Sequence, residues 1–323
     1  MVRPLLASLV ACTSPDSAAP TRAVQGIELT WLGVTTWLLR TPHQTFLLDA
    51  YLTRGAPGAV ASGPEAAALL DLVMRAEEID GIDHILVGHS HFDHAWDAGT
   101  AARQTGATVW GSATTCHIAA AQGLAGGRCR VVSDGDILDL GGGTAEVVRT
   151  SHWGPDTPSG AHGVWTEPPA GPEEVGLAPH GGVLGFLLEL EGNRIFVHDT
   201  LGPVDAEDGS GFDYRAGLDR IAAGPPVDLW IGAVSLATDA SMLDPYLRAL
   251  RTPAVLAHHW DGVVPDPRQP LLQSFSAQVF VGDALESAGA ALSAPRAYGE
   301  RLVFDGRDVT TAAHSPVVDA LQQ

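Results

Sequence analysis

The sequence predicts an α/β fold in which sheets are covered by helices on their outer faces. Short apolar runs typical of buried strands alternate with alanine- and leucine-rich segments of helical spacing along most of the 323 residues. The second half of the chain repeats this pattern, and we find no linker that would divide the remainder into independent domains. No apolar run reaches the roughly 18 residues that a membrane-spanning helix needs.

In the first half, strands and helices are expected in alternation. Strand patterns occur at 27–32, 45–50, 84–88 and 107–112. Helical patterns occur at 63–79, 95–106 and 112–124, and Ser112 is a suitable N-cap for the last of them.

The second half contains further strands separated by tight turns. Asp-Gly and Gly-Gly turns break up the segment 130–152, and a hairpin at 181–200 is expected to turn at Gly192–Asn193. Buried strands are expected at 227–234 and 254–260.

The charge of the chain argues against nucleic acid as a partner. Asp and Glu number 38 against 18 basic residues, all of them arginine, for a formal charge of −20. Such a surface repels phosphate backbones, so we expect a small-molecule or lipid-like substrate and interpret the charge as a contribution to solubility.

A cluster of ligand-type side chains follows the strand at 84–88. His89, His91, Asp93 and His94 lie within six residues. Alternate residues of an extended chain share a face, so His89 and His91 are expected to point the same way. Imidazole nitrogen and carboxylate oxygen suit zinc, iron or manganese, and a divalent cation would offset the repulsion within the cluster.

Similar residues stand at the ends of three later strands. His152, Asp199 and the pair His258–His259 each follow an apolar run and precede a glycine-containing turn. A single histidine at a strand end is more often an ordinary hydrogen-bonded residue. The layout repeated three times predicts one convergent site.

These residues resemble the metal-binding residues of the metallo-β-lactamase-fold hydrolases. The matching parts are "HSHFDH" at 89–94, then His152, Asp199 and His259 in the family's order, with Asp49 and "GDILDLGG" also similar. The resemblance covers about residues 27–261. Within the superfamily, the "WLG" opening and the "HW" at 259–260 look most like the branch of ascorbate-6-phosphate lactonase-like and N-acyl-phosphatidylethanolamine phospholipase D-like hydrolases.

The resemblance implies a four-layered αβ/βα sandwich, of the α/β class or α+β in some schemes, with two divalent metal ions at one edge between the sheets. Asp49 would accept a hydrogen bond from a ligand histidine. Zinc is the favoured metal, with manganese or iron as alternatives, and His258 stays open as an alternative to His259. The implied ligands are His89, His91 and His152 for the first ion, Asp93, His94 and His259 for the second, and Asp199 as the bridge.

The function implied is that of a metal-dependent hydrolase that activates water against an ester, lactone, amide or phosphodiester bond. Asp93 would also accept or relay a proton, and no GxSxG nucleophile motif competes. An iron-dependent redox enzyme on the same fold and a non-catalytic metal-stabilised binding protein are the alternatives. A true β-lactamase is not favoured, because many of those enzymes have cysteine where this chain has Asp199.

The N-terminal segment resembles a bacterial lipoprotein signal. Cys12 ends "LVAC" behind an apolar stretch, as in a lipobox, although eleven residues precede it where signal peptides have about 15–30. Either the true start lies upstream or the match is accidental. We expect an exported protein, lipid-anchored through Cys12 in a bacterial envelope, with a cytoplasmic location as the alternative.

The remaining expectations concern boundaries and single residues. We expect a signal-like segment at 1–26, one hydrolase domain at 27–310 and a tail at 311–323. A Pro/Gly-rich insertion at 155–182 is placed to cover the site, with Trp153, Trp165 and His180 as candidate substrate contacts, or is a surface insertion with incidental aromatics. Cys116 and Cys129 either pair or, as the favoured interpretation, are small buried side chains.

Overall fold

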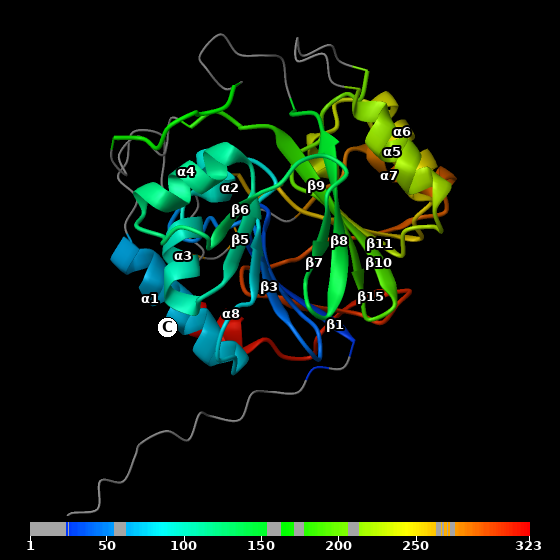
Figure 1. Cartoon of the computed structure of the whole chain (residues 1–323). Helices are drawn as coiled ribbons and strands as arrows, with labels where there is room; N and C mark the ends of the chain where they lie inside the picture. Colours follow the sequence, from blue (N-terminus) through cyan, green and yellow to red (C-terminus); the bar gives the residue numbers. More distant parts are fainter. Residues whose placement is uncertain are drawn as a thin grey trace, which may run out of the picture.

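Two β-sheets lie face to face between two layers of helices (Figure 1). The computed structural model describes residues 24, 26–54, 63–153, 163–170, 178–205, 213–262, 266, 268–269, 271 and 275–323. The expected four-layered α/β sandwich is confirmed. The N-terminal segment that contains Cys12 and much of the insertion at 155–182 lie outside the described residues.

The first sheet has the strand order β15-β14-β1-β2-β3-β4-β5-β6. Pairing is antiparallel from β15 to β3 and parallel from β3 to β6. Its strands are β1 Ile27–Gly33, β2 Thr36–Arg40, β3 Thr45–Leu48, β4 His84–Leu86, β5 Thr108–Gly111, β6 Cys129–Val131, β14 Arg301–Phe304 and β15 Val309–Thr311.

The second sheet has the order β13-β12-β11-β10-β9-β8-β7. It is antiparallel from β7 to β10 and parallel from β10 to β13. Its strands are β7 Ile137–Asp139, β8 Gly143–Thr150, β9 Val183–Leu190, β10 Asn193–His198, β11 Leu229–Gly232, β12 Ala254–Ala257 and β13 Ala291–Ser293.

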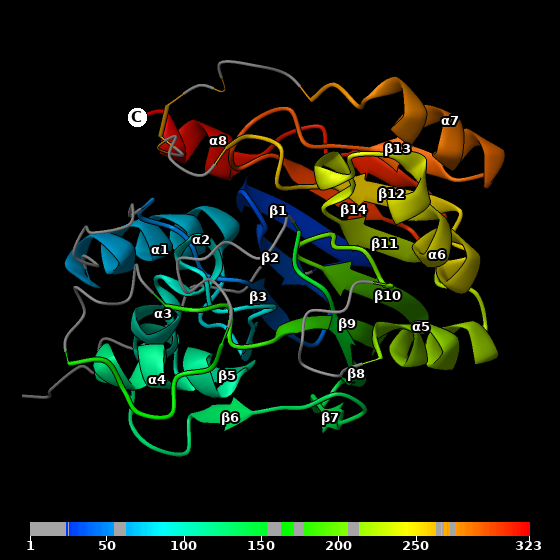
Figure 2. The ribbon, with the colours of Figure 1, turned by 90° about the horizontal axis from the view of Figure 1, so that it is seen from above.

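Helices cover the outer face of each sheet (Figure 2). The first sheet is covered by α1 Gly63–Glu77, α2 Phe92–Ala95, α3 Ala98–Thr105, α4 Ala113–Ala121 and α8 Pro316–Leu321. The second is covered by α5 Tyr214–Ala223, α6 Ala240–Leu250 and α7 Val279–Ser287, and a short 3₁₀ helix spans Val234–Leu236. No helix in the described ranges is both long and apolar enough to span a bilayer.

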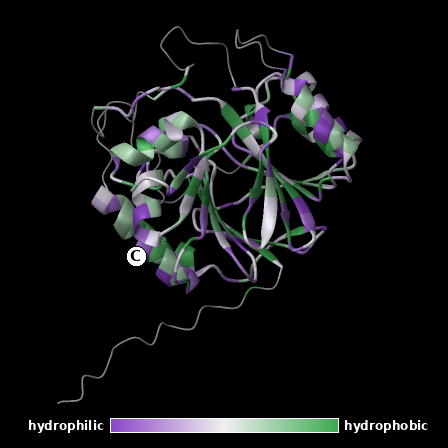
Figure 3. Cartoon of the chain, in the orientation of Figure 1, coloured by the Kyte–Doolittle hydropathy of each residue, from purple (hydrophilic) through white to green (hydrophobic). Residues whose placement is uncertain are grey.

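Alternation along the strands divides the apolar side chains between two cores. On β10, Val197 faces the core between the sheets, and its neighbour Phe196 faces the core beneath α5, α6 and α7. Figure 3 shows apolar segments along strands of both sheets and a mixture of apolar and polar residues along the helices. This division follows from the two-residue period of a strand and explains why many strands read as continuous apolar runs.

The directions of the strands bring their carboxyl ends to one edge. β3 and β4 run parallel, as do β10, β11 and β12. β8 runs in the same direction as β10, because both are antiparallel to β9. Residues that follow these strands can therefore lie close together at that edge. The strands concerned are β3, β4, β8, β10 and β12.

The turn between β9 and β10 differs by one residue from its prediction. Residues Glu191 and Gly192 form it, with φ of 51° and 76°, and Asn193 already pairs with Leu190 as the first residue of β10. A two-residue turn with positive φ at both positions matches the twist of a hairpin, and glycine adopts the second of these without strain. The expected turn at Gly192–Asn193 is corrected accordingly.

The C-terminal residues are packed against the domain. Residues 311–323 were expected to form a tail, but Pro316–Leu321 form α8, in which Val317 and Leu321 are buried in the core. β14 also pairs directly with β1. The last residues are therefore an integral part of the first layer.

Cys116 and Cys129 form a disulfide, so the favoured interpretation as small buried side chains is wrong. Both residues are partly exposed. α4 connects β5 to β6 and returns over the sheet, which brings the two Cα atoms to 5.5 Å, a separation that suits the bond. The disulfide ties α4 to the edge strand β6.

Glu77, the last residue of α1, is fully buried against the first sheet. Its carboxylate accepts a hydrogen bond from Thr30 Oγ1 at 2.7 Å and lies 3.2 Å from Arg40 Nη1 and 2.7 Å from Arg301 Nη2. These contacts join α1 to β1, β2 and β14.

We expect Glu77→Ala to lower the free energy of unfolding by about 3–5 kcal/mol, because the change leaves buried guanidinium groups without their carboxylate. Glu65→Ala, in the first turn of the same helix, is the control, since the exposed pair of Glu65 with Arg268 is worth about 0–1 kcal/mol. Urea unfolding followed by circular dichroism measures both. Equal losses in the two variants would contradict the buried role of Glu77.

Candidate metal centre

The segment after β4 carries four ligand-type side chains into one place. β4 ends at Leu86, His89 and His91 lie on the following loop, and Asp93 and His94 lie on the single turn of α2. The rings of His89 and His94 are 3.9 Å apart between centroids, and both side chains are almost completely buried. Burying so many polar groups together costs free energy unless a cation is bound among them.

The second sheet contributes residues from three strand ends. His152 follows β8, and its ring lies 5.0 Å from that of His89 and 4.7 Å from that of His91. Asp199 follows β10, and its Oδ2 lies 2.7 Å from His89 Nδ1 and 3.3 Å from His94 Nδ1. His259 follows β12 and lies within reach of Asp93 and His94, so all seven residues singled out from the sequence meet at the edge between the sheets.

Three overlapping groups within this cluster have their nitrogen and oxygen atoms within 4.8 Å of one another. The groups are His89, His91 and His152; His89, His94 and Asp199; and Asp93, His94 and His259. The first and third correspond to the two ligand sets that the resemblance implied, and the second contains the residue expected between them.

Asp49 and Thr35 both lie within hydrogen-bond distance of His94 Nδ1. Asp49 Oδ2 and Thr35 Oγ1 each lie 2.9 Å from His94 Nδ1, and Thr35 Oγ1 donates to Asp49 Oδ2 at 2.6 Å. Asp49 is the acceptor that the resemblance implied. Thr35, in the turn between β1 and β2, was missed, because nothing in "GVTTW" distinguishes its hydroxyl from that of Thr36. The pair turns His94 Nε2 toward Asp93, whose Oδ2 is 3.6 Å away.

His259, and not His258, faces the cluster. His259 Nε2 lies 3.5 Å from Asp93 Oδ2. His258 is fully buried on the other side, where its Nδ1 accepts from Trp37 Nε1 at 3.1 Å and its Nε2 lies 3.0 Å from the carbonyl oxygen of His198. His259 has a left-handed backbone with φ of 59°, a strained conformation typical of functional sites.

The electrostatics of the cluster favour a bound cation. Burial, followed by repulsion from neighbouring histidines, holds the pKa of His89 well below its ordinary value and lowers the pKa of His152 to about 3, so both rings are neutral and keep a lone pair. For His94, neighbouring carboxylates outweigh burial and raise the pKa to about 9. Burial and a nearby second carboxylate raise the pKa of Asp199 well above its ordinary value.

The donor atoms present fit a divalent metal ion. Asp199 Oδ1 is buried and has no hydrogen-bond partner among the described residues. A buried carboxylate oxygen without a donor is costly, and a cation would compensate it. Imidazoles and carboxylates together are the ligand types of zinc sites and of non-haem iron or manganese sites.

The described part of the insertion also reaches the cluster. The ring of His180 is stacked on that of His152 with centroids 5.8 Å apart, whereas Trp153 is exposed and Trp165 is partly buried. Trp165 is anchored by its backbone N–H, which donates to Thr114 Oγ1 at 2.9 Å. Of the three candidate substrate contacts, His180 is the one with ring contacts to the ligand-type histidines.

His198 faces away from the cluster, as the alternation along β10 predicted. It is fully buried and stacked on Tyr246 of α6, with centroids 4.9 Å apart. Neither ring nitrogen has a hydrogen-bond partner in the part of the chain that the structure describes, and burial lowers the pKa of His198 to about 3.

His198→Phe is expected to make the protein less sensitive to acid. The unfolded chain binds a proton at His198 below about pH 6.5, whereas the folded chain does so only near pH 3. The wild type therefore loses stability as the pH falls through this range, by up to about 1.4 kcal/mol per pH unit from this group. The free energy of unfolding is measured at pH 7, 5.5 and 4.5. As the pH falls, the value for the variant should rise relative to that of the wild type, and a difference that stays constant with pH would contradict this.

Comparison with known proteins identifies the relatives of the chain. The family model of the metallo-beta-lactamase superfamily matches residues 29–207. A UPF0173 metal-dependent hydrolase from Herpetosiphon aurantiacus is 31% identical over 171 residues, which is 53% of this chain and 59% of that protein. Two further curated relatives of this group are covered over 37% and 30% of their length, so the chain spans less than two thirds of the relatives it matches.

Solved structures share the fold at low sequence identity. Igni18, a metallo hydrolase from Ignicoccus hospitalis, is 14% identical with a TM-score of 0.52, over 90% of this chain and 99% of that one. CmlA, a diiron β-hydroxylase from Streptomyces venezuelae, is 15% identical with a TM-score of 0.52, over 90% of this chain and 55% of that one. At this identity the likeness establishes the architecture alone.

Proposed function

The chain belongs to the metallo-beta-lactamase superfamily, and from this premise we propose that it is a metal-dependent hydrolase with a dinuclear site. The observation that carries the proposal is the meeting of seven histidine and aspartate side chains, from one strand end of the first sheet and three of the second, in three overlapping ligand groups. The relatives named metal-dependent hydrolases support the same reaction type.

The proposed ligands follow the groups in the structure. His89, His91 and His152 would hold one ion, and Asp93, His94 and His259 the other. Asp199 would serve both, since its Oδ2 lies close to His89 and His94 while its Oδ1 lacks a partner among the described side chains. We propose zinc as the metal, with manganese or iron as alternatives.

When bound, a pair of such ions supplies a water of lowered pKa and positive charge that stabilises the transition state. The residues of the chain provide the rest. Asp49 and Thr35 orient His94 through its Nδ1, and burial keeps His89 and His152 neutral. The carboxylate of Asp93, whose pKa is lowered because His94 and His259 outweigh its burial, is the group we propose to accept or relay a proton.

The proposed bond classes are ester, lactone, amide and phosphodiester in a small-molecule or lipid-like substrate. A bound pair of cations would dominate the local field, so the formal charge of −20 does not argue against an anionic substrate. The aspartate at position 199, where many β-lactamases have cysteine, makes a β-lactam the least favoured substrate.

A second candidate is an iron-dependent redox enzyme. The fold of CmlA, a diiron β-hydroxylase, matches 90% of this chain, and histidine and carboxylate ligands also suit iron. A non-catalytic metal-stabilised binding protein is a third possibility, which the full set of seven ligand-type residues disfavours.

Metal analysis of the purified protein followed by a substrate panel tests these candidates. We expect two zinc or manganese ions per chain and turnover of at least one lactone, phosphodiester, acyl-phospholipid or ester. Iron together with substrate-dependent oxygen consumption would favour the redox enzyme. Protein that binds no divalent metal at micromolar concentration would contradict the proposal.

We also propose that the protein is exported and anchored through a lipid on Cys12. Disulfides persist mainly in oxidising compartments, and the bond between Cys116 and Cys129 is consistent with one. Mass spectrometry of the protein from its native host tests the proposal: a lipid-modified Cys12 at the N-terminus is expected, and an unprocessed Met1 with free thiols at 116 and 129 would favour the cytoplasmic alternative.

A further inference from the structure

His180 lies beside the metal cluster without belonging to it. Its ring is nearly parallel to that of His152, at 12°, and lies 6.0 Å from that of His91. None of the three ligand groups found among the described residues includes His180. His180 is therefore a buried imidazole packed against two residues of the first ligand group and outside all three groups.

The backbone of the insertion determines which nitrogen of His180 carries a proton. The N–H of Gly182 donates to His180 Nδ1 at 2.8 Å. In the neutral ring the exchangeable proton is therefore on Nε2, which points away from Gly182. His180 is thus oriented as a hydrogen-bond donor through Nε2.

The position of His180 is coupled to the metal-binding segment. The N–H of Ser90, between the ligand-type residues His89 and His91, donates to the carbonyl oxygen of His180 at 2.9 Å. A displacement of this part of the insertion would therefore also displace the loop that carries the two histidines. Hydrogen bonds of this kind fix the position of a functional side chain relative to a reacting centre.

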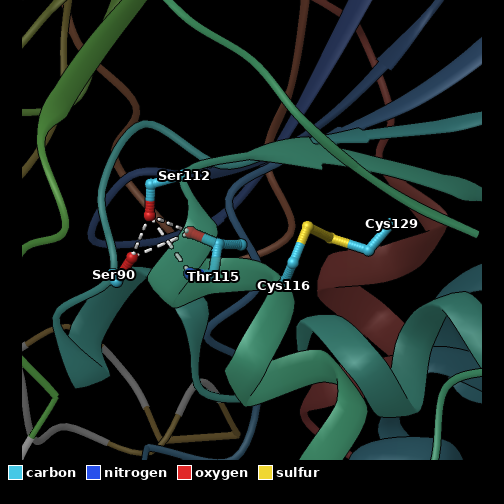
Figure 4. The surroundings of a disulfide bond; sticks show 5 residues. All are labelled: Ser90, Ser112, Thr115, Cys116 and Cys129. Atoms are coloured by element: carbon cyan, nitrogen blue, oxygen red, sulfur yellow. Dashed lines mark hydrogen bonds between the residues drawn. A yellow bond between two sulfur atoms is a disulfide. The ribbon is translucent and has the colours of Figure 1, made fainter. Parts of the chain in front are cut away.

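Gly181 packs on a cluster of three hydroxyl groups. Ser90, Ser112 and Thr115 lie within 2.7–3.2 Å of one another, next to the disulfide that ties α4 to β6 (Figure 4). Gly181 has φ of 72°, and a Cβ on it would lie 2.4 Å from Ser112 Oγ and 2.8 Å from Ser90 Oγ. Only glycine fits here without strain, so the segment next to His180 packs closely against this hydroxyl cluster.

We propose that His180 donates a hydrogen bond from Nε2 to an oxygen of the substrate, on the side of His89, His91 and His152. The oxygen is the one on which negative charge develops, in a carbonyl or phosphoryl group. This inference rests on the proposed hydrolase function and deepens it, because it assigns a substrate-binding residue outside the metal ligands.

The test compares the metal-loaded wild type with His180→Phe and His180→Gln, using inorganic phosphate as the probe. Phenylalanine keeps a ring and removes the donor, whereas glutamine places an amide N–H near the position of Nε2. Calorimetry should show phosphate binding weakened roughly 10-fold or more in His180→Phe, and within about threefold of the wild type in His180→Gln. His314→Phe, at an exposed histidine far along the chain, is the control.

Metal content separates the possible outcomes. We expect the wild type and both variants at 180 to hold the same number of ions, with thermal midpoints within a few degrees. Loss of an ion in His180→Phe would show that His180 is a ligand and would overturn the inference, as would equal phosphate affinity, or none, in wild type and His180→Phe. If His180→Phe does not fold, His180→Met removes the donor with a more flexible side chain. A wild type without metal would instead refute the proposed function itself, and the inference with it.

Discussion

Replacing His91 or Asp93 with alanine is expected to reduce hydrolysis by on the order of 10³-fold or more while leaving the fold intact. A bound metal contributes several kcal/mol to transition-state stabilisation, and each 1.4 kcal/mol or so is a factor of about ten in rate. His91 is partly exposed and Asp93 lies on the short α2, so neither alanine opens a large cavity in the core. The measurements are kcat/KM, bound metal and the circular dichroism spectrum of each variant.

The two variants should differ in which ion they lose. His91 belongs to the group with His89 and His152, and Asp93 to the group with His94 and His259, so each alanine weakens a different half of the site. His314→Ala is the control, because His314 is exposed and lies at the surface, where its Nε2 is 3.7 Å from Asp319 Oδ2. Full activity in either variant at 91 or 93, with unchanged metal content, would refute the dinuclear hydrolase.

The site residues that could be predicted are those marked by a local sequence pattern, such as an apolar run followed by a ligand-type residue. His152 and Asp199 stand within two residues of the ends of β8 and β10, and strand direction brings such positions to one edge. The alternation of faces left His258 and His259 as alternatives, and the resemblance favoured His259, which the structure turns to the cluster. The fold class could be predicted for the same reason. The buried strands are continuous apolar runs, and apolar residues recur with helical spacing in the segments between them.

The parts that could not be predicted depend on contacts between distant segments. Thr35, in the turn between β1 and β2, reaches His94 on α2 across 59 positions of sequence. The left-handed backbone of His259 is stabilised by hydrogen bonds from its own N–H to the carbonyl of Val34 and from Ser235 Oγ to its carbonyl. The pairing of Cys116 with Cys129 likewise depends on the path of α4 over the sheet. None of these leaves a periodic signal in the sequence.

Gly88→Ala is expected to reduce metal affinity by roughly 10- to 100-fold, the loss typical of disturbing a residue that orients a metal ligand. Gly88 precedes His89, and a Cβ added to it would lie 2.2 Å from Asp199 Oδ2. The carboxylate would have to leave the position in which it lies 2.7 Å from His89 Nδ1. The backbone at Gly88 does not have positive φ, so the effect would come from this collision and not from conformational strain.

Competition with a chromogenic chelator measures the metal affinity, and urea unfolding of the metal-free protein measures the accompanying strain, which we expect at about 1–3 kcal/mol for overpacking. Gly126→Ala is the matched control, because a Cβ there meets nothing within 4 Å and its φ is not positive. Asp199→Ala should lower the affinity at least as much as Gly88→Ala. Adding Gly88→Ala to Asp199→Ala should then lower it little further, since the collision has lost its partner. Additive losses in the double variant would contradict the explanation and would mean that Gly88 acts through its own loop, independently of Asp199.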